Sequence, residues 1–280
     1  MALGLSSPSG RSLRVTSNVL LLLIGIIFAL PMLWLLLASF DGGATLAVSW
    51  PKNFTLDNFR KVLTPALAFL PLWNSFVLSA GSALVTVVFA ILAAYPLSRY
   101  KSRYNKPFLY GVLFGTCLPI TAMMVPVYSL FVLLNLIDSL PGTLFFMAAS
   151  SLPMAIWMMK NFVDSVPMSL EEAAWTDGAS SMRTLWSVVV PLMRPGIAVV
   201  FIFVFVQAWG NFFVPFVLLL SPQNQPASVS IFTFFGQYGT VAYGQLAAYS
   251  LVYAVPVLAL YVVVSRVLGG SSALAGAVKG

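Results

Sequence analysis

Residues 195–220 read PGIAVVFIFVFVQAWGNFFVPFVLLL, and no charged residue follows until Arg266. A helix needs about 20 apolar residues to cross the hydrocarbon core of a membrane. This charge-free segment is therefore long enough for two spans and a loop. The whole 280-residue chain is 60% hydrophobic and only 8% charged. Because a soluble globular chain carries about 25% charged residues, the composition excludes that class and indicates a polytopic membrane protein.

Four earlier charge-free runs, at 15–40, 62–98, 107–137 and 139–159, are each long enough for one span. We therefore predict an all-α membrane protein with six transmembrane helices. The predicted spans are 19–38, 73–95, 108–134, 143–162, 196–220 and 246–268. They form one six-span transmembrane domain over 19–268, flanked by tails at 1–18 and 269–280. The prolines inside the spans are expected to kink these helices without ending them.

The lysines and arginines predict the orientation, because cytoplasmic loops carry an excess of them. With the N-terminus inside, eleven fall on the inner side and three on the outer side. The inner set is Arg11, Arg14, Arg99, Lys101, Arg103, Lys106, Lys160, Arg183, Arg194, Arg266 and Lys279, and the outer set is Lys52, Arg60 and Lys61. Both termini are therefore predicted to be cytoplasmic. The same placement explains the net charge of +7 without a nucleic acid, and leaves residues 99–103 as a topology signal and an anionic-lipid contact.

Several functional classes lack the residues they need. There is no histidine and only one cysteine, so a disulfide within the chain and the usual metal sites are not expected. No Asp, Glu or His lies inside a predicted span, although ion-driven carriers usually hold ionisable groups there. The chain has no G-x-x-x-x-G-K-[ST] motif and no loop large enough for an ATPase domain. Energy for active transport would have to come from another chain.

The segment 164–195 between spans four and five holds four of the seven acidic residues. Ser169 and Glu172 have the spacing of a capping box, and Gly178 suits the left-handed residue that ends a helix. These signals predict a short helix over 170–177 and a second over 182–190, ended by Pro191 and Pro195 before span five. Two interpretations remain open on physical grounds, a solvated interfacial loop and a docking element for a cytoplasmic partner.

Glu172-Ala173-Ala174, Gly178 and Val188-Val189-Val190-Pro191 resemble the E-A-A-x3-G-x9-I-x-L-P loop of bacterial ATP-binding-cassette importer permeases, in particular the maltose-type sugar permeases. Val188 and Val190 replace the usual Ile and Leu. Trp209-Gly210-Asn211-Phe212 resembles a second stretch of that family, with an inserted glycine, and the last five residues, 276–280, resemble the C-terminal tail of one permease subunit.

The resemblance implies a transport subunit with no enzymatic activity and no cofactor of its own. ATP and Mg would bind a separate ATPase dimer, and the other partners would be a second related permease, an extracytoplasmic solute-binding protein and a sugar. The 169–191 loop would be the coupling element. The implied ATPase contacts are Glu171, Glu172, Ala173, Ala174, Asp177, Gly178 and Pro191 in this loop, and Lys279 in the C-terminal tail.

Amides and aromatic rings at membrane depth are candidates for binding a sugar, which has hydroxyls and an apolar ring face. The candidates are Asn135, Trp157, Gln207, Trp209, Asn211 and Phe212. Gln207 and Asn211 share a helix face at 100° per residue, whereas Trp209 points elsewhere. Each has a structural alternative: Asn135 as a helix cap, Trp157 in an interfacial belt, and the others in interhelical packing.

Three rival functions follow from the same residues. An importer permease could carry a glycerophosphodiester, a polyamine or an amino acid. A stand-alone secondary carrier would need ionisable groups within the spans, and a membrane-embedded enzyme would need a nucleophile with a base or a metal site. The sugar class rests on the resemblance alone.

Overall fold

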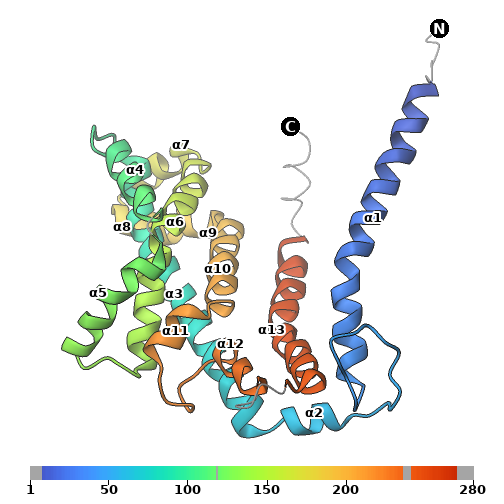
Figure 1. Ribbon diagram of the computed structural model, residues 1–280. Helices are drawn as coiled ribbons and strands as arrows, with labels where there is room; N and C mark the ends of the chain where they lie inside the picture. Colours follow the sequence, from blue (N-terminus) through green and yellow to red (C-terminus); the bar gives the residue numbers. More distant parts are fainter. Residues whose placement is uncertain (1–7, 118, 236–240, 270–280) are drawn as a thin grey trace. The chain divides into compact units, whose positions relative to one another are not determined.

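The computed structural model describes residues 8–117, 119–235 and 241–269, and all regular structure in those ranges is helical. Charge-free runs become helices because the membrane interior leaves backbone groups no partner outside their own segment. The long helices are α1 (Pro8–Ser39), α3 (Leu70–Arg99), α6 (Leu140–Asp164) and α13 (Tyr243–Gly269) (Figure 1). The all-α prediction is confirmed for these ranges.

Four helices are long and apolar enough to cross a membrane, and the number rises to six if two interrupted pairs each count as one span. The first pair is α4 (Asn105–Gly115) with α5 (Ile120–Leu133). The second is the segment Ser181–Leu192 with α10 (Arg194–Trp209), which meet at a bend of 81°. The predicted spans 108–134 and 196–220 are therefore not continuous helices. The latter is broken after Trp209 and resumes as α11 (Phe213–Leu218).

The chain divides into two compact units. One comprises Met1–Thr64 with Ile231–Tyr253, and the other comprises Pro65–Ser230 with Ala254–Gly280. The first unit contains α1, α2 (Asp57–Val62), the short 3₁₀ helix η3 (Ile231–Phe234) and the start of α13. The Asn58 side chain donates to the carbonyls of Ser39 (3.1 Å) and Asp41 (2.9 Å), which ties α2 to the end of α1.

The second unit is built on α3, which packs against α6 and α10. It is preceded by a π-helical turn, η1 (Pro65–Phe69), and also contains α12 (Ala227–Ser230). Small and hydroxylated residues form the packed face of α3, and the hydroxyls of Ser82 and Thr86 each donate over 3.1 Å to carbonyls of α6. A Cβ atom at Gly81 would lie 2.3 Å from Leu144 Cδ1, so the two backbones approach closely. This is the usual basis of helix packing in membranes.

Two ends of this helical group hold the candidate sites. Near one end lie α7 (Met168–Thr176), α8 (Ser181–Thr184), the π-helical turn η2 (Leu185–Val189) and α9 (Val190–Leu192) (Figure 1). Towards the other end, α11 packs against α5 and α6. The helix-turn-helix predicted between spans four and five is present as α7 and the α8–α9 segment.

Candidate functional site

The α7 helix ends in a turn that requires glycine. Gly178 has a φ of +83°, a left-handed conformation that side chains other than glycine rarely adopt. The Gly178 amide donates to the Trp175 carbonyl (3.0 Å) and the Ala179 amide to the Ala174 carbonyl (2.9 Å). These two bonds make a Schellman motif, which satisfies the last carbonyls of the helix. The predicted role of Gly178 as the residue that ends this helix is confirmed.

The start of α7 differs from the prediction. The helix begins at Met168, with Pro167 at its N-cap and no side-chain capping bond. Ser169 therefore lies inside the first turn, where it does not cap, and the capping box predicted for Ser169 and Glu172 is wrong. The proline explains the shift, because its fixed φ starts a helix readily while its side chain offers no acceptor. The second helix begins at Ser181, where the Ser180 hydroxyl accepts from the Arg183 amide, and it bends at Met193 beyond Pro191.

Glu171 is completely buried and paired with Arg99. Its Oε1 accepts from Arg99 Nε at 2.6 Å and lies 2.6 Å from Arg99 Nη2, while Oε2 accepts from the Tyr95 hydroxyl at 2.8 Å. The Arg99 side chain is only 8% exposed. A buried carboxylate needs such a partner and such hydrogen bonds, since an unpaired buried charge is strongly destabilising. Glu171 therefore faces its own chain.

Arg99 also joins three helices at one point. It lies at the last residue of α3, binds α7 through Glu171, and donates from Nη2 to the carbonyls of Val163 and Val166, each at 3.0 Å. Those two carbonyls belong to the last turn of α6 and the residues just after it. The position of α7 is thus fixed relative to the ends of α3 and α6. Sequence reasoning assigned Arg99 to membrane topology and missed this role, because its partner lies 72 positions along the chain.

The outward surface of the α7 segment carries the other predicted contact residues. Glu172, Ala173, Asp177 and Gly178 are exposed, whereas Ala174 is half-buried. Large apolar side chains are also exposed on α7, at Met168 and Leu170, and on the following α8 and η2, at Met182 and Trp186. Pro191 is half-buried inside α9, and Lys279 lies outside the described residues. A surface that mixes small, acidic and apolar groups can bind a protein partner.

A separate cavity of about 570 Å³ is lined by Gln207 and Asn211 from the end of α10. Hydroxyls of Thr116, Ser150 and Ser151 line it together with apolar side chains, among them Met123, Phe146, Met154 and Phe203. None of its lining residues is ionisable. Gln207 and Asn211 both line this cavity and Trp209 does not, as predicted. They do not share a helix face, however, because α10 ends at Trp209 and Asn211 lies in the break that follows.

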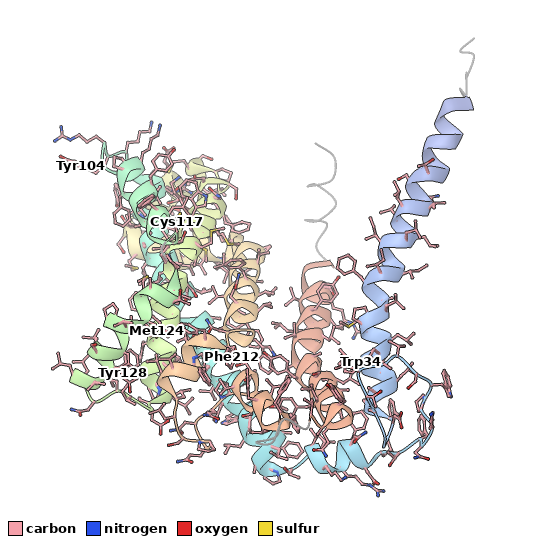
Figure 2. All side chains as sticks on the ribbon, viewed as in Figure 1. Trp34, Tyr104, Cys117, Met124, Tyr128 and Phe212 are labelled. Atoms are coloured by element: carbon pink, nitrogen blue, oxygen red, sulfur yellow. The ribbon has the colours of Figure 1, made fainter. Side chains whose placement is uncertain are left out.

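The other solute-path candidates lie elsewhere. Trp209 is buried and stacks on Phe205 at 5.7 Å between ring centroids. Phe212, labelled in Figure 2, precedes α11 and stacks on Phe216 at 4.9 Å. Asn135 has a φ of 54°, and its amide donates to Val132, so it ends α5 as the helix-cap alternative requires. The structure therefore gathers two of the six candidates in this cavity, and Trp157 lines a different cavity near the end of α3.

Asn211 is held in place at the break between α10 and α11. Its side-chain Oδ1 accepts from the Val214 amide at 3.1 Å, and its backbone carbonyl accepts from the Ser228 hydroxyl at 2.9 Å. Gln207 makes no side-chain hydrogen bond to any described residue, so its amide is available to a solute. Among the residues the structure describes, no group of three potential metal ligands occurs. The site is suited to reversible binding of a polar, uncharged molecule.

Comparison with known proteins identifies the family. Residues 86–270 match the family described as binding-protein-dependent transport system inner membrane component. The chain belongs to this family. It is therefore a multi-pass membrane permease of the ATP-binding-cassette importer class, as the α7 loop motif predicted.

Similar proteins span almost the whole chain. A sulfoquinovosyl glycerol transport system permease, SmoH of Agrobacterium fabrum, is 32% identical over 99% of this chain and 97% of its own length. A diacetylchitobiose uptake system permease, NgcG of Streptomyces coelicolor, is 29% identical over 95% of this chain and 89% of its own. The solved structure of a bacterial ABC transporter for the acidic polysaccharide alginate has a chain with the same fold. That chain is matched with a TM-score of 0.82 at 22% identity, over 94% of this chain and 99% of its own.

Proposed function

We propose that this chain is the permease subunit of an ATP-driven importer for a neutral carbohydrate and that residues 169–191 couple it to a separate ATPase dimer. Its further partners would be a related permease in a heterodimer and an extracytoplasmic solute-binding protein. The chain would lie in a bacterial cytoplasmic membrane with both termini in the cytoplasm. The excess of lysine and arginine on the side of the α7 loop supports that orientation.

The observation that carries the proposal is that two adjacent glutamates on α7 have different surroundings. Glu171 is 0% exposed and bound to Arg99, whereas the adjacent Glu172 is exposed with Ala173, Asp177 and Gly178. One carboxylate thus anchors the helix while the other remains available. Small residues beside it allow a partner's surface to approach closely. The exposed Met168, Leu170, Met182 and Trp186 would supply the apolar area of the contact.

The anchor also suggests how movement would pass into the membrane. If two ATPase subunits close on ATP and displace α7, the Arg99 contacts would carry the displacement to the ends of α3 and α6. The movement could reach the cavity through α6, because residues of both α6 and α10 line it. Its opening would then alternate between the two sides of the membrane.

The cavity chemistry favours a neutral carbohydrate over a charged solute. Amides and hydroxyls recognise sugar hydroxyls, and apolar and aromatic side chains contact the ring face. A phosphodiester or carboxylate would meet no cation among the lining residues, and a polyamine would meet no carboxylate. Relatives whose names specify diacetylchitobiose and glucose uptake support the same class of solute.

Affinity purification of the tagged full-length chain in mild detergent, with mass spectrometry of its partners, tests the coupling proposal. We expect an ATPase and a second permease to co-purify with the wild type. The double variant Glu172→Ala/Gly178→Asp should lose the ATPase and keep the permease. Asp57→Ala is the control, because it removes an exposed acid from α2 outside the loop. An ATPase retained by the double variant would overturn the docking role.

The carbohydrate proposal needs a separate readout. The solute-binding protein that stimulates uptake by the purified complex is titrated with neutral sugars, anionic sugars, amino acids and polyamines. We expect neutral sugars to bind. Tight binding of an amino acid or a polyamine alone would reject the carbohydrate class and leave the ATPase docking intact.

A further inference from the structure

A second cavity, of about 390 Å³, lies where α3 ends, α4 begins and α6 approaches its last turn. Three lysines line it, Lys101, Lys106 and Lys160, together with the rings of Tyr110 and Trp157. Tyr104, labelled in Figure 2, belongs to the same turn between α3 and α4. The proposed transport function uses none of these side chains.

The charge of this cavity is positive. Lys160 is neutralised, because its Nζ lies 2.6 Å from Asp164 Oδ2, and Asp164 also accepts from the Ser98 hydroxyl. Lys101 and Lys106 make no ion pair within the described ranges, and no acidic residue lines the cavity. Two ammonium groups are thus left without a counter-charge.

Asn105 fixes the backbone turn that carries the two lysines without an ion pair. Its side-chain amide donates to the carbonyls of Tyr100 (2.6 Å) and Leu97 (3.2 Å), so the first turn of α4 is fastened to the last turn of α3. Lys101 follows directly after the first of these carbonyls, and Lys106 follows Asn105. The turn therefore fixes the backbone positions from which the two exposed lysine side chains extend.

The rest of the cavity is aromatic and continues onto an apolar helix face. The Tyr110 and Trp157 rings lie 6.2 Å apart between centroids, above the buried Leu109. Tyr110 is 61% exposed and Phe114, one turn further along α4, is 73% exposed. Residues four positions apart share one helix face. The surface thus passes from cations through aromatic rings to hydrocarbon, as a phospholipid passes from phosphate through glycerol to acyl chain.

We propose that this cavity binds the headgroup of an anionic phospholipid. Lys101 and Lys106 contact the phosphate, Tyr110 and Trp157 flank the glycerol, and an acyl chain runs along the α4 face that includes Phe114. Basic cavities between membrane helices bind anionic headgroups by this chemistry. The cavity adjoins Arg99, whose neighbours Ser98 and Tyr100 line it, so a bound lipid would brace the turn that holds the α7 anchor.

Lipid binding is measured by native mass spectrometry of the full-length chain with its co-purified partners, released from a neutral detergent. Phosphatidylglycerol and phosphatidylcholine with the same acyl chains are titrated in parallel. We expect phosphatidylglycerol to bind at least tenfold more tightly. Since each lysine near an anionic surface contributes about 1 kcal/mol, Lys101→Gln/Lys106→Gln should weaken its binding by roughly ten- to thirtyfold.

Two control variants separate a built site from general charge. Lys52→Gln/Lys61→Gln removes two exposed lysines outside this cavity and should leave phosphatidylglycerol binding unchanged. Lys101→Arg/Lys106→Arg keeps the charge and should retain binding. An unchanged melting temperature of the glutamine variant would show that it has not simply misfolded. Equal loss in the Lys52/Lys61 variant, or equal binding of the two lipids, would overturn the proposal.

A third arm distinguishes the lipid from a soluble anion. Inorganic phosphate and glycerol 1-phosphate are added at millimolar concentration as competitors. We expect neither to displace phosphatidylglycerol, because they lack the acyl chain that the aromatic face contacts. Displacement by either at low millimolar concentration would overturn the lipid assignment and identify a site for a soluble phosphate. None of these outcomes depends on the identity of the transported solute.

Discussion

The α7 segment and the cavity at the end of α10 use polar residues in opposite ways. At α7 the charged groups stabilise structure, because Glu171, Arg99 and the end of α6 form one buried cluster that positions the helix. At the cavity, the polar groups are amides and hydroxyls without charge, and Gln207 makes no side-chain bond to the described residues. Under the proposed function, a firmly positioned α7 would transmit movement from the ATPase, and a cavity with an unbonded amide would bind and release solute.

Removing Arg99 should have the largest effect. Arg99→Met leaves the fully buried Glu171 carboxylate without its cation, and we expect about 3–5 kcal/mol of lost stability. Thermal unfolding of the purified chain in detergent measures it. The double variant Arg99→Met/Glu171→Leu should recover most of the loss, because no charge is then left buried. A single variant as stable as the double one would show that the pair does not hold α7.

The pair Glu171 and Glu172 shows what the sequence could and could not reveal. The charge-free runs predicted where the long helices lie, and Gly178 predicted where α7 ends. Both predictions succeeded because they depend on local sequence. The spacing of Ser169 and Glu172 favoured Glu172 as the structural residue, whereas tertiary contact with Arg99 selected Glu171. Adjacent helical residues differ by 100° in direction, and nothing local shows which direction is buried.

The helix breaks were hidden for a related reason. Residues 209–213 contain Gly210 and Asn211 but no charge, so the gaps between charged residues do not show that the helix ends there. The Asn211 side chain accepts from the Val214 amide at the start of α11, a contact that the sequence does not reveal. Gln207 and Asn211 meet at one cavity although they do not share a helix face, and the roles of Trp209 and Asn135 depended on packing and on backbone conformation.

Substitution of Gly178 tests whether α7 acts as the lever. A Cβ at this position would meet nothing within 4 Å, so a steric clash is not the source of any effect. The φ of +83° strains other residues, and a carboxylate would add charge beside Asp177 on the exposed surface. We expect Gly178→Asp to reduce solute uptake by roughly tenfold or more at normal membrane levels.

The variant Gly178→Asn, whose side chain has the shape of aspartate without its charge, separates backbone strain from the effect of the added charge. Asparagine tolerates the left-handed conformation, so uptake should fall less than with aspartate. Radiolabelled uptake, normalised to the amount of inserted protein on immunoblots, compares them. Wild-type uptake with Gly178→Asp would remove the α7 turn from the coupling proposal.

Gln207→Leu tests the cavity side of the comparison. The change keeps the shape of the side chain approximately and deletes one uncommitted amide, so a single solute hydrogen bond is lost. Such a bond contributes about 0.5–1.5 kcal/mol, and we expect the KM of uptake to rise roughly three- to tenfold with unchanged thermal stability. Trp209→Phe is the matched control, because Trp209 is buried against Phe205 and does not line the cavity. It should leave KM unchanged, and a larger KM effect there would move the solute path to the other face of α10.

The smallest effect is expected at Asp138, a second place where a charge holds structure. Its Oδ1 accepts from the amides of Leu220 and Ser221, each at 2.9 Å, and its Oδ2 accepts from the Ser221 hydroxyl. Burial alone would raise the pKa of this carboxyl, but the bonds from Ser221 and Leu220 together hold the pKa below its usual 3.8. They link the loop after α5 to the segment after α11.

The sign of the pH effect follows from that lowered pKa. Below pH 3.8 the unfolded chain binds a proton at Asp138 before the folded chain does, so its contribution to stability is present above that pH and is lost as the pH falls further. We expect the melting temperature of the wild type to fall more steeply than that of Asp138→Asn as the pH drops below 3.8, measured in a detergent whose headgroup does not titrate. The variant should also melt lower at pH 7, because a neutral amide is a weaker acceptor for the two backbone amides. Parallel pH profiles for the two proteins would show that this link does not need the charge. The Glu171–Arg99 cluster at α7 would then be the one place, of the two compared, where a charge stabilises the structure.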